Sequence, residues 1–581
     1  MKLSEGFQLL ATAQDGVARL RELILSLAVR GNLTSRNVCG EPPCKLLQRI
    51  RSEREQLIES GQMKVGRAPS PVTNDEKPFD LPSGWQWAKL GSLSLHITDG
   101  THHTPKYVPT GVPFISIKDI NGRTISFEDC KFISEEEHEL INRRCNPERG
   151  DVLICRIGTL GRPTIVDTDV PFSVFVSVGL VKLPKCVDIS AYLRLALSSP
   201  VLTAQYEQIK AGGSHTQKLN LGDIPQLLIP LPPIEEQAEI VAKVDELMRL
   251  CDELEAGGRL EAEQHTRLTA NLFEALAASE SSHALAENWS RIAAHFDLLL
   301  DRPEAVDTLE QTILQLAVRG LLVSQDPNDE PASVVLGEVR AARYRLSAQG
   351  KTSRSKTPSK DSDESPTAPR PGWEMVTFPD LCIIGGGATP SKSKAAYWDG
   401  KLPWVSPKDM KVEHISDAQD HVSELALEET RLPLVPERSL LIVVRGMILA
   451  HSFPVGITQV EVTINQDMKS LTPLVTALAP YLALVCRGHK REILNLVDRS
   501  THGTCKLQSD KLFAFRFGLP PLAEQSRILA RVEELRRLCA DLRSRLTARQ
   551  TCQAHFAEAL VGLAASTTPL PAPSDDLAAA A

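Results

Sequence analysis

The chain has 581 residues, of which 42% are apolar and 24% are charged, and its formal net charge is −8. This length allows roughly three to five domains, and the negative charge argues against a nonspecific polycationic DNA binder. The twelve cysteines form no zinc-type pairs, and neither a signal peptide nor a membrane-length apolar run is present. We therefore expect a cytoplasmic protein with reduced thiols and no membrane span.

The chain is a tandem duplication of a unit of about 288 residues. "LPPIEEQAEIVAKVDELMRLCDELE" at 231–255 matches "LPPLAEQSRILARVEELRRLCADLR" at 519–543. Further matches pair "LILSLAVRGNL" (23–33) with "TILQLAVRGLL" (312–322), "SGW" (83–85) with "PGW" (371–373), and "YVPTGVPFISIKDI" (107–120) with "YWDGKLPWVSPKDM" (397–410). Because the offset hardly drifts, the whole unit is repeated and not a single motif.

Each copy begins with two predicted helices and a polar linker. In the first copy, Gly31 stops a helix whose apolar face consists of Leu20, Ile24, Leu27 and Ala28. Second amphipathic stretches occupy 43–60 and 331–348. The linkers that follow are rich in Pro and Ser, and the one at 350–370 is too polar to fold alone.

The segments after Trp85 and Trp373 are expected to be rich in β-strand. Short runs such as "VPFISI", "DVLICRI" and "SVFVSVGLVKL" are separated by Gly, Pro and Asp. A long helix then begins after each "LPP". This order of elements predicts an α+β fold with two β-rich domains and a helical spacer between them.

The two long helices carry an apolar seam with heptad spacing, which requires a partner helix. The seam residues are Ile240, Val244, Leu247, Cys251 and Leu254 in the first copy and Ile528, Val532, Leu535, Cys539 and Leu542 in the second. We expect the two helices to pack antiparallel within the chain, with the "LAVRG" helices completing the bundle. Gly257 and Gly258 are expected to interrupt the first helix.

These patterns predict a pseudo-twofold molecule made of seven segments. They are an N-terminal helical region with its linker (1–78), a first β-rich domain (79–233), a central helical region (234–349), a disordered linker (350–370), a second β-rich domain (371–521), a C-terminal helical region (522–566) and a disordered tail (567–581). Duplex DNA is the commonest partner with matching near-twofold symmetry.

Two pairs of loops offer side chains that could bind DNA. The first pair contains Thr101, His102, His103, Thr104 and Lys106 and, in the second copy, Thr389, Ser391, Lys392 and Lys394. The second pair contains His215, Thr216, Gln217 and Lys218 and, in the second copy, His502, Thr504 and Lys506. Gln217 could pair with adenine. A solvated turn is the alternative for the histidine loop, and metal binding is disfavoured because adjacent histidines rarely converge on one ion.

Three cationic positions are predicted to be equivalent in the two copies: Lys118 with Lys408, Arg156 with Arg445, and Lys218 with Lys506. Phosphate contacts are independent of sequence, so both domains can keep them while the base-reading loops diverge. The alternative is that Asp119 and Asp409 merely hold the first two lysines in place. Because the loops of the two copies differ, an asymmetric target is expected.

The sequence also argues against catalysis by this chain. A P-loop pattern and an NPPY-like methyltransferase tetrapeptide are both missing. "IIGGGATPS" (383–391) is more simply a turn that approaches the DNA backbone than a cofactor loop. The Asp-x-Lys triplets at 409–411 and 467–469 have no partner acid at nuclease spacing. We expect no catalytic site, no metal site and no cofactor on this chain.

The chain resembles the specificity subunits of type I restriction–modification enzymes. The motifs that carry the resemblance are the LPP helices, the "LAVRGLLVSQDPNDEPAS" segment, the "PSGW" and "RPGW" sequences at the domain entrances and the duplicated loops. The resemblance covers almost the whole chain. It implies two target recognition domains that read a bipartite double-stranded DNA sequence, with helices that set the gap and dock two modification (methyltransferase) subunits. It also implies that those subunits use S-adenosylmethionine and that restriction subunits use ATP and Mg²⁺.

Two other readings stay open from the sequence. A helical scaffold whose β-rich domains bind protein would explain the long helices, but not the paired basic positions and donor-rich loops so simply. A fused enzyme with a hidden methyltransferase would bind S-adenosylmethionine by itself. Salt-dependent DNA affinity separates the first reading from a DNA-binding subunit.

Overall fold

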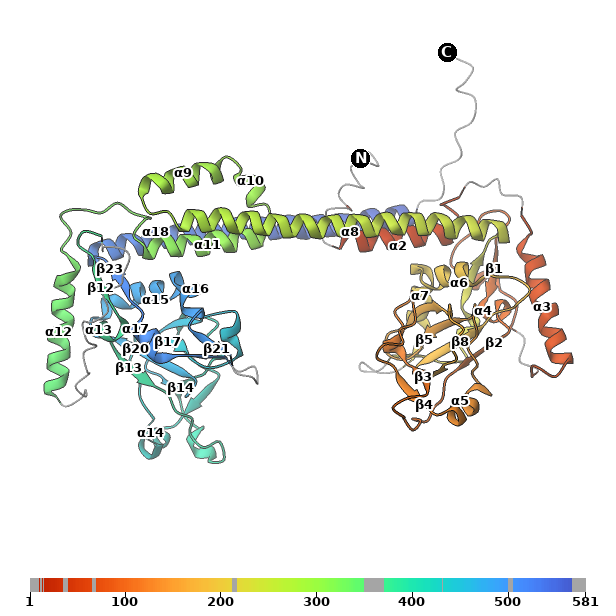
Figure 1. The fold of residues 1–581 in the computed structure, drawn as a ribbon, viewed down its shortest axis with the longest axis horizontal. Coiled ribbons are helices and arrows are strands. Elements are labelled where there is room, and N and C mark those ends of the chain that lie inside the picture. The colour runs from red at the N-terminus through yellow and green to blue at the C-terminus, as the bar shows by residue number, and fades with distance from the viewer. Residues whose placement is uncertain are drawn as a thin grey trace, which may run out of the picture. The chain divides into compact units, whose positions relative to one another are not determined.

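The computed structural model describes residues 10, 13, 15–34, 40–64, 69–211, 217–349, 370–430, 432–499 and 505–566. Its contacts divide the chain into two compact units (Figure 1). Unit 1 comprises Met1–Glu261 and Gln550–Ala581, and unit 2 comprises Ala262–Arg549. Of the expected disordered linker (350–370), residues 350–369 lie outside the described residues, as does the expected tail (567–581). The sequence-derived domain boundaries remain predictions.

Unit 1 contains two small sheets and two short strand pairs. The four-stranded sheet has the order β2 (His96–Asp99), β8 (Val178–Lys182), β5 (Val152–Cys155) and β6 (Gly161–Ile165), and the three-stranded sheet has the order β4 (Lys131–Ile133), β3 (Val112–Ile115) and β7 (Ser173–Val174). The pairs are β1 (Gln86–Lys89) with β11 (Leu228–Leu231) and β9 (Lys210–Ala211) with β10 (Lys218–Leu219). All pairs are antiparallel except β3 with β7.

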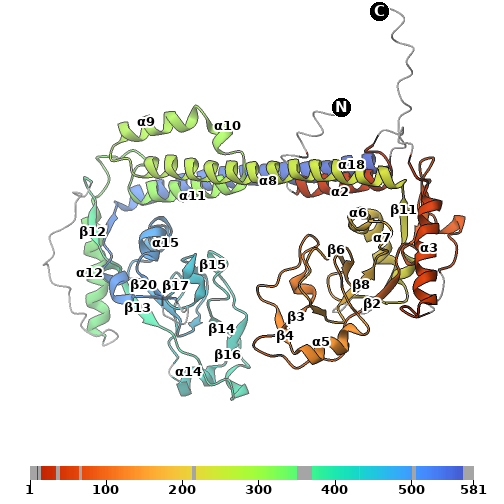
Figure 2. The same ribbon diagram turned by 45° about the vertical axis from the view of Figure 1, so that its right-hand side comes forward.

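The helices of unit 1 pack on its four-stranded sheet, except α5, which packs against the three-stranded sheet. They are α2 (Gly16–Val29), α3 (Pro43–Glu59), α4 (Leu90–Leu93), α5 (Glu135–Asn142), α6 (Ser190–Leu197), α7 (Pro200–Ile209) and the first part of α8 (Ile234–Ala277). In Figures 1 and 2, α6 and α7 lie between the sheet and α2. The apolar residues of α2, α6 and α8 share one core with Val152, Ile154 and Val181 of the sheet.

Unit 2 repeats this plan. Its larger sheet has the order β13 (Cys382–Gly386), β20 (Met468–Pro473), β17 (Leu440–Val443), β18 (Val455–Thr458) and β15 (His414–Ile415), and its smaller sheet has the order β16 (Asp420–Val422), β14 (Leu402–Val405) and β19 (Thr463–Ile464). Strand β12 (Glu374–Val376) pairs with β23 (Phe517–Leu519), and β21 (Val497–Arg499) with β22 (Cys505–Leu507). The predicted α+β fold and tandem duplication are confirmed.

The helices of unit 2 follow the same order, with α17 in place of the 3-10 turn at Ile224–Gln226 and with one added helix pair. They are α11 (Pro303–Val318), α12 (Ala332–Ala348), α13 (Phe378–Leu381), α14 (Glu424–Thr430), α15 (Ala479–Gly488), α16 (Lys490–Leu494), α17 (Ser509–Ala514) and most of α18 (Leu522–Ser566). Helices α9 (Ser282–Ala293) and α10 (Phe296–Leu299) precede α11. In unit 1 the described part of the chain contains no counterpart of this pair.

The long helices pack antiparallel, as predicted, but their two seams lie in different cores. In unit 1, Ile240, Val244 and Cys251 of α8 share a core with α2 and with Ala557 near the end of α18. In unit 2, Cys539 of α18 shares a core with α11 and the end of α8. Each seam therefore packs against the "LAVRG" helix of its own unit and the far end of the other long helix.

The expected interruption of the first long helix is wrong. Helix α8 continues through Gly257 and Gly258 for 44 residues, and α18 has 45. Nothing lies within 4 Å of a Cβ placed on either glycine. Because these residues are solvent-exposed, the helix pays the entropy cost of two glycines without also losing core packing.

The ion pairs between the seam helix and the "LAVRG" helix have opposite polarity in the two units. In unit 1, Arg21 of α2 lies 2.7 Å from Glu255 of α8. In unit 2, the equivalent positions hold Glu310 of α11 and Arg543 of α18, which are 2.8 Å apart. Exchanging helices between the copies would place like charges opposite each other, so this reversal favours the correct pairing of duplicated helices.

The LPP and Gly-Trp motifs form one structural element in each unit. The Trp85 indole donates to Glu236 at 2.9 Å, and Trp373 donates to Glu524 at 2.9 Å. The neighbouring amide groups of Gln237 and Gln525 donate to the carbonyls of Pro232 and Pro520. The tryptophan thus ties the entrance of each β-rich domain to the start of the long helix that leaves it.

We predict that Glu524→Gln stabilises unit 2 at neutral pH by about 1 kcal/mol, the scale of one buried polar group. Burial raises the pKa of the Glu524 carboxyl, although the hydrogen bond from Trp373 opposes this. The folded protein therefore binds this proton more tightly than the unfolded chain, and stability falls as the pH rises from about 4.3 through the folded pKa. A glutamine carbonyl keeps the indole hydrogen bond without a buried charge.

Urea denaturation between pH 4 and 8 measures this effect. The variant should lose the part of the pH dependence that Glu524 causes. Glu533→Gln, on the exposed side of the same helix, is the matched control and should leave the wild-type profile unchanged. Equal profiles for Glu524→Gln and wild type would contradict the prediction.

Candidate nucleic-acid interface

In each unit, the loop after the first strand of the larger sheet is held against a strand of the smaller sheet, β7 in unit 1 and β19 in unit 2. The amide of Thr101 donates to the carbonyl of Val174 at 3.1 Å, and in unit 2 the amide of Ala388 donates to Ile464 at 2.9 Å. A Cβ on Gly100 would lie 1.9 Å from the Val174 oxygen, and one on Gly387 would lie 2.1 Å from the Asn465 oxygen. This close backbone approach requires glycine at both positions.

The second predicted loop reaches the same edge of the sheet. The amide of Leu219 donates to the Arg156 carbonyl at 2.8 Å, and that of Gly158 donates to Gln217 at 2.8 Å. In unit 2, Leu507 donates to Val444 at 2.9 Å. We call this region the loop edge; it consists of 99–104, 156–158 and 217–219 in unit 1 and of 386–391, 444–446 and 505–507 in unit 2.

The predicted equivalence of Arg156 and Arg445 is wrong. Isolated β-bridges pair Ile157 with Lys218 and Arg445 with Lys506, so Arg445 corresponds to Ile157. The counterpart of Arg156 is Val444. Arg156 is buried and donates to Asp99 at 2.6 Å, whereas Arg445 is exposed. The structure therefore does not support a phosphate contact that both units share at this position.

The first loop of unit 1 does not gather its histidines around one point. His102 Nε2 lies 3.0 Å from Asp99, and His103 Nε2 lies 2.6 Å from Glu137. Thr101 is buried and bonds to His103 Nδ1 at 2.7 Å. Thr104 and Lys106 are exposed. Within the described ranges no group of three or more His, Cys, Asp or Glu is arranged to hold a metal ion.

The matching loop of unit 2 is held by different contacts. Thr389 bonds to Gln466, and the hydroxyls of Ser391 and Ser393 are 2.8 Å apart. Lys394 is exposed, and a hydrogen bond to Glu429 raises its pKa. Lys392 is exposed and is not joined to a partner by any ion pair among the residues described here. Of the two lysines, Lys392 is thus the freer to bind a phosphate.

The second loop is described only at its ends. Gln217, Lys218 and Lys506 are exposed at the loop edge. His215, Thr216, His502 and Thr504 lie outside the described residues, so their predicted roles are not addressed. The structure therefore brings the two predicted loops of each unit together through their flanking residues.

Lys118 and Lys408 lie on equivalent turns and are exposed. Asp119 accepts hydrogen bonds from the amide and hydroxyl of Ser116 at 2.8 and 2.9 Å. Asp409 accepts the same two bonds from Ser406, both at 2.8 Å. The aspartates hold the turns and form no ion pair with the lysines, so the alternative role suggested for them from the sequence is wrong.

Sequence reasoning missed three charged residues in or beside the loop edges: Asp99, Arg144, which binds Asp99, and Lys469, which pairs with Gly386. Asp99 is 1% exposed, although it is a carboxylate. An acidic residue at the end of an apolar strand, directly before a glycine, was the available signal. Arg144 and Lys469 become significant only through strand pairing and the packing of α5.

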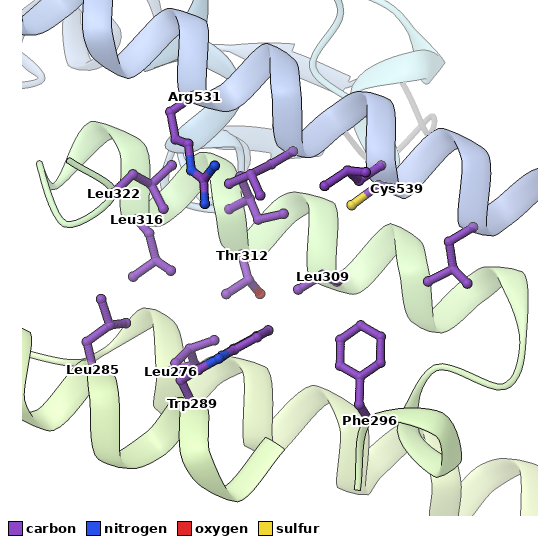
Figure 3. A pocket seen from close by; sticks show the side chains of 14 residues that line it. Leu276, Leu285, Trp289, Phe296, Leu309, Thr312, Leu316, Leu322, Arg531 and Cys539 are labelled. Carbon is purple, nitrogen blue, oxygen red and sulfur yellow. The ribbon is translucent and has the colours of Figure 1, made fainter. Parts of the chain in front are cut away.

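Unit 2 also contains an apolar hollow away from its loop edge (Figure 3). It has a volume of about 400 Å³ and lies among α8, α9, α10, α11 and α18. Trp289 and Phe296 point into it from one side, and Leu309 and Leu316 line the other. The nearly apolar lining offers few donors to a nucleic acid, so this hollow is not part of the candidate interface.

The chain is thus a duplicated protein whose two units carry equivalent loop edges with different side chains. The family model described as "Type I restriction modification DNA specificity domain" matches residues 82–264 and again 371–549, more than half of the chain. The chain therefore belongs to this family, the specificity subunits of type I restriction–modification enzymes, and carries the domain twice.

Individual relatives extend this similarity along the chain. The chain is 29% identical to the EcoEI specificity subunit of Escherichia coli and 28% identical to the EcoAI specificity subunit of the same organism, each over 94% of both chains. A solved structure of the HsdS subunit from Thermoanaerobacter tengcongensis is 20% identical and covers 84% of this chain and 98% of that one, with a TM-score of 0.37. In the part of the chain described, no helix is long and apolar enough to cross a membrane.

Proposed function

We propose that each unit reads one half of an asymmetric, bipartite sequence in double-stranded DNA. The supporting observation is that the two loop edges have the same backbone framework but different side chains. A common framework fits a common docking mode, and different donors and acceptors fit different bases. Lys118, Lys408, Lys218 and Lys506 are exposed on both units and suit phosphate contacts.

In this proposal the chain itself is not catalytic. A specificity subunit works in a complex with other subunits and DNA. Two modification subunits bind S-adenosylmethionine and methylate adenine, and restriction subunits use ATP and Mg²⁺. The long helices dock the modification subunits and set the gap between the two half-sites.

Co-expression with the neighbouring methyltransferase gene, followed by mapping of methylated adenines across the host genome, tests this function. One bipartite motif with two unlike halves is the expected result. Soluble co-purified proteins without any such motif, and without a salt-dependent DNA affinity, would instead support the protein-binding scaffold.

The role of the helices in setting the gap predicts a change in target spacing. Helix α8 passes from unit 1 to unit 2 after Glu261, and α18 passes back after Arg549. Inserting seven residues after Gly258 and after Arg549 lengthens both links by about 10 Å and nearly preserves the helical phase. Because the packing within each unit is kept, the gap should grow by about three base pairs.

The same methylation mapping measures this change. Both half-sites should stay unaltered while the number of unspecified bases between them increases. Insertion in α8 alone makes the two helical links unequal in length and should abolish methylation. An unchanged gap in the double-insertion variant would rule out the helices as the spacer.

A further inference from the structure

One row of residues across the main sheet has opposite charge in the two units. In unit 1, strand pairing places Asp99, Gly179 and Ile154 side by side. In unit 2, the same row holds Gly386, Lys469 and Ile442. The buried isoleucine is kept, but an Asp–Gly pair is replaced by a Gly–Lys pair.

In unit 1 the carboxylate of this row binds three basic side chains. Asp99 is 1% exposed and receives Arg156 Nη1 at 2.6 Å and His102 Nε2 at 3.0 Å. Its other oxygen binds Arg144, whose side chain remains 55% exposed. A guanidinium held by a buried carboxylate loses less conformational freedom when it binds a further acceptor.

Arg144 also borders a hollow in the surface of unit 1. The hollow has a volume of about 240 Å³, and Thr101, His102, His103 and Ile141 contribute to its lining. The free nitrogens of a fixed guanidinium present paired donors, which fit the O6 and N7 atoms of guanine or two phosphate oxygens. Unit 1 thus presents an arginine from the turn after α5 beside the predicted histidine loop.

In unit 2 the ammonium of Lys469 takes the place of this carboxylate. Its Nζ lies 3.3 Å from where a Cβ on Gly386 would be, so the side chain lies over the glycine that replaces Asp99. Lys469 is half-buried, and no ion pair joins it to another residue in the described ranges. A half-buried ammonium without an anion is costly unless an external anion binds it.

We propose that Arg144 and Lys469 contact DNA, each on a different half of the target, and that this row makes the two half-site readers different. Arg144 contributes a planar pair of donors that Asp99 positions, and Lys469 contributes a single point charge. The proposal rests on the proposed function, because it needs two units that bind separate half-sites. Asp99 is a positioning residue and has no DNA contact of its own.

The test uses the complete chain in complex with its methyltransferase subunits and starts from the motif that the wild-type complex methylates. Three duplexes are compared: one with the motif, one with the first half scrambled and one with the second half scrambled. Arg144→Ala should weaken binding to the motif about tenfold. This loss of affinity should disappear when the half-site that Arg144 contacts is scrambled and persist when the other half-site is scrambled. Lys469→Met should show the reverse dependence on the two halves.

Matched controls separate these contacts from a general loss of positive charge. Arg143→Ala removes the exposed arginine next to Arg144, and Lys490→Met removes a half-buried lysine elsewhere in unit 2. If Arg144 touches a base, its loss should also relax methylation at one position of the motif; a phosphate contact should only lower the affinity and the salt slope. Either pattern supports the proposal.

Failure of the proposed function and failure of the assignment of Arg144 and Lys469 give different results. If the wild-type complex methylates no bipartite motif, the proposed function fails. If the motif exists but Arg144→Ala and Lys469→Met bind all duplexes as their controls do, or both depend on the same half, the proposed function stands and this assignment is overturned.

Discussion

Replacing Gly100 with alanine is expected to destabilise the loop edge of unit 1 and to abolish recognition of its half-site. The new Cβ would lie 1.9 Å from the Val174 oxygen and 2.6 Å from the Phe175 carbonyl carbon. Both neighbours are backbone atoms, so the segment that includes β7 must move. Overpacking of this kind typically costs about 1–3 kcal/mol, and occasionally more. Gly387→Ala should have the same effect on unit 2.

Urea denaturation and DNA binding by the assembled complex measure the two consequences. The controls are Gly222→Ala in unit 1 and Gly337→Ala in unit 2, because nothing lies within 4 Å of a Cβ at either position. Each loop variant should lose discrimination at one half-site only. Wild-type affinity and denaturation midpoints for both variants would show that the loops accommodate a methyl group.

Replacing Arg156 with valine is expected to destabilise unit 1 by about 3–5 kcal/mol, the cost of removing one partner from a buried ion pair. The substitution deprives the buried Asp99 carboxylate of Arg156 and leaves it with Arg144 and His102, both of which are exposed. It also removes the bonds from Arg156 to the Leu219 and Val176 carbonyls. The denaturation midpoint of unit 1 should fall accordingly.

The residues at the equivalent positions of unit 2 indicate a second substitution that should restore this stability. Where unit 1 has Asp99 and Arg156, unit 2 has Gly386 and Val444. The double variant Asp99→Gly with Arg156→Val should therefore recover much of the lost stability, because no buried charge remains. It should not recover first-half recognition, since Arg144 loses its anchor. A double variant that is no more stable than Arg156→Val would show that Asp99 was not the source of the penalty.

Much of the fold was predictable because the duplicated motifs are local in sequence. The helix at Gly16–Val29, its stop at Gly31 with φ +71°, and the strands within "VPFISI" and "DVLICRI" follow from periodicity and turn chemistry. The prediction of an interruption at Gly257 and Gly258 was wrong because exposed glycines weaken a helix without ending it when its flanks are packed.

The candidate site was less predictable, because its residues are brought together by strand pairing. The offset between copies is 287 residues at Asp99 and Gly386 but 290 residues at Val174 and Ile464. Local insertions between strands cause these differences. The prediction paired Arg156 with Arg445 at an offset of 289 residues, whereas the hydrogen bonds from Leu219 and Leu507 give an offset of 288 at this position and place Val444 opposite Arg156.

The sequence by itself determined the duplication, the order of helices and strands, and the LPP helices, since these depend on residues close together in the chain. Only the tertiary structure decided which side chains meet. It buried Arg156 against Asp99, left Arg144 exposed beside them, and gave the equivalent row in unit 2 a lysine. The physical reason is that burial and charge pairing depend on neighbours far apart in sequence, which the register of the sheet selects.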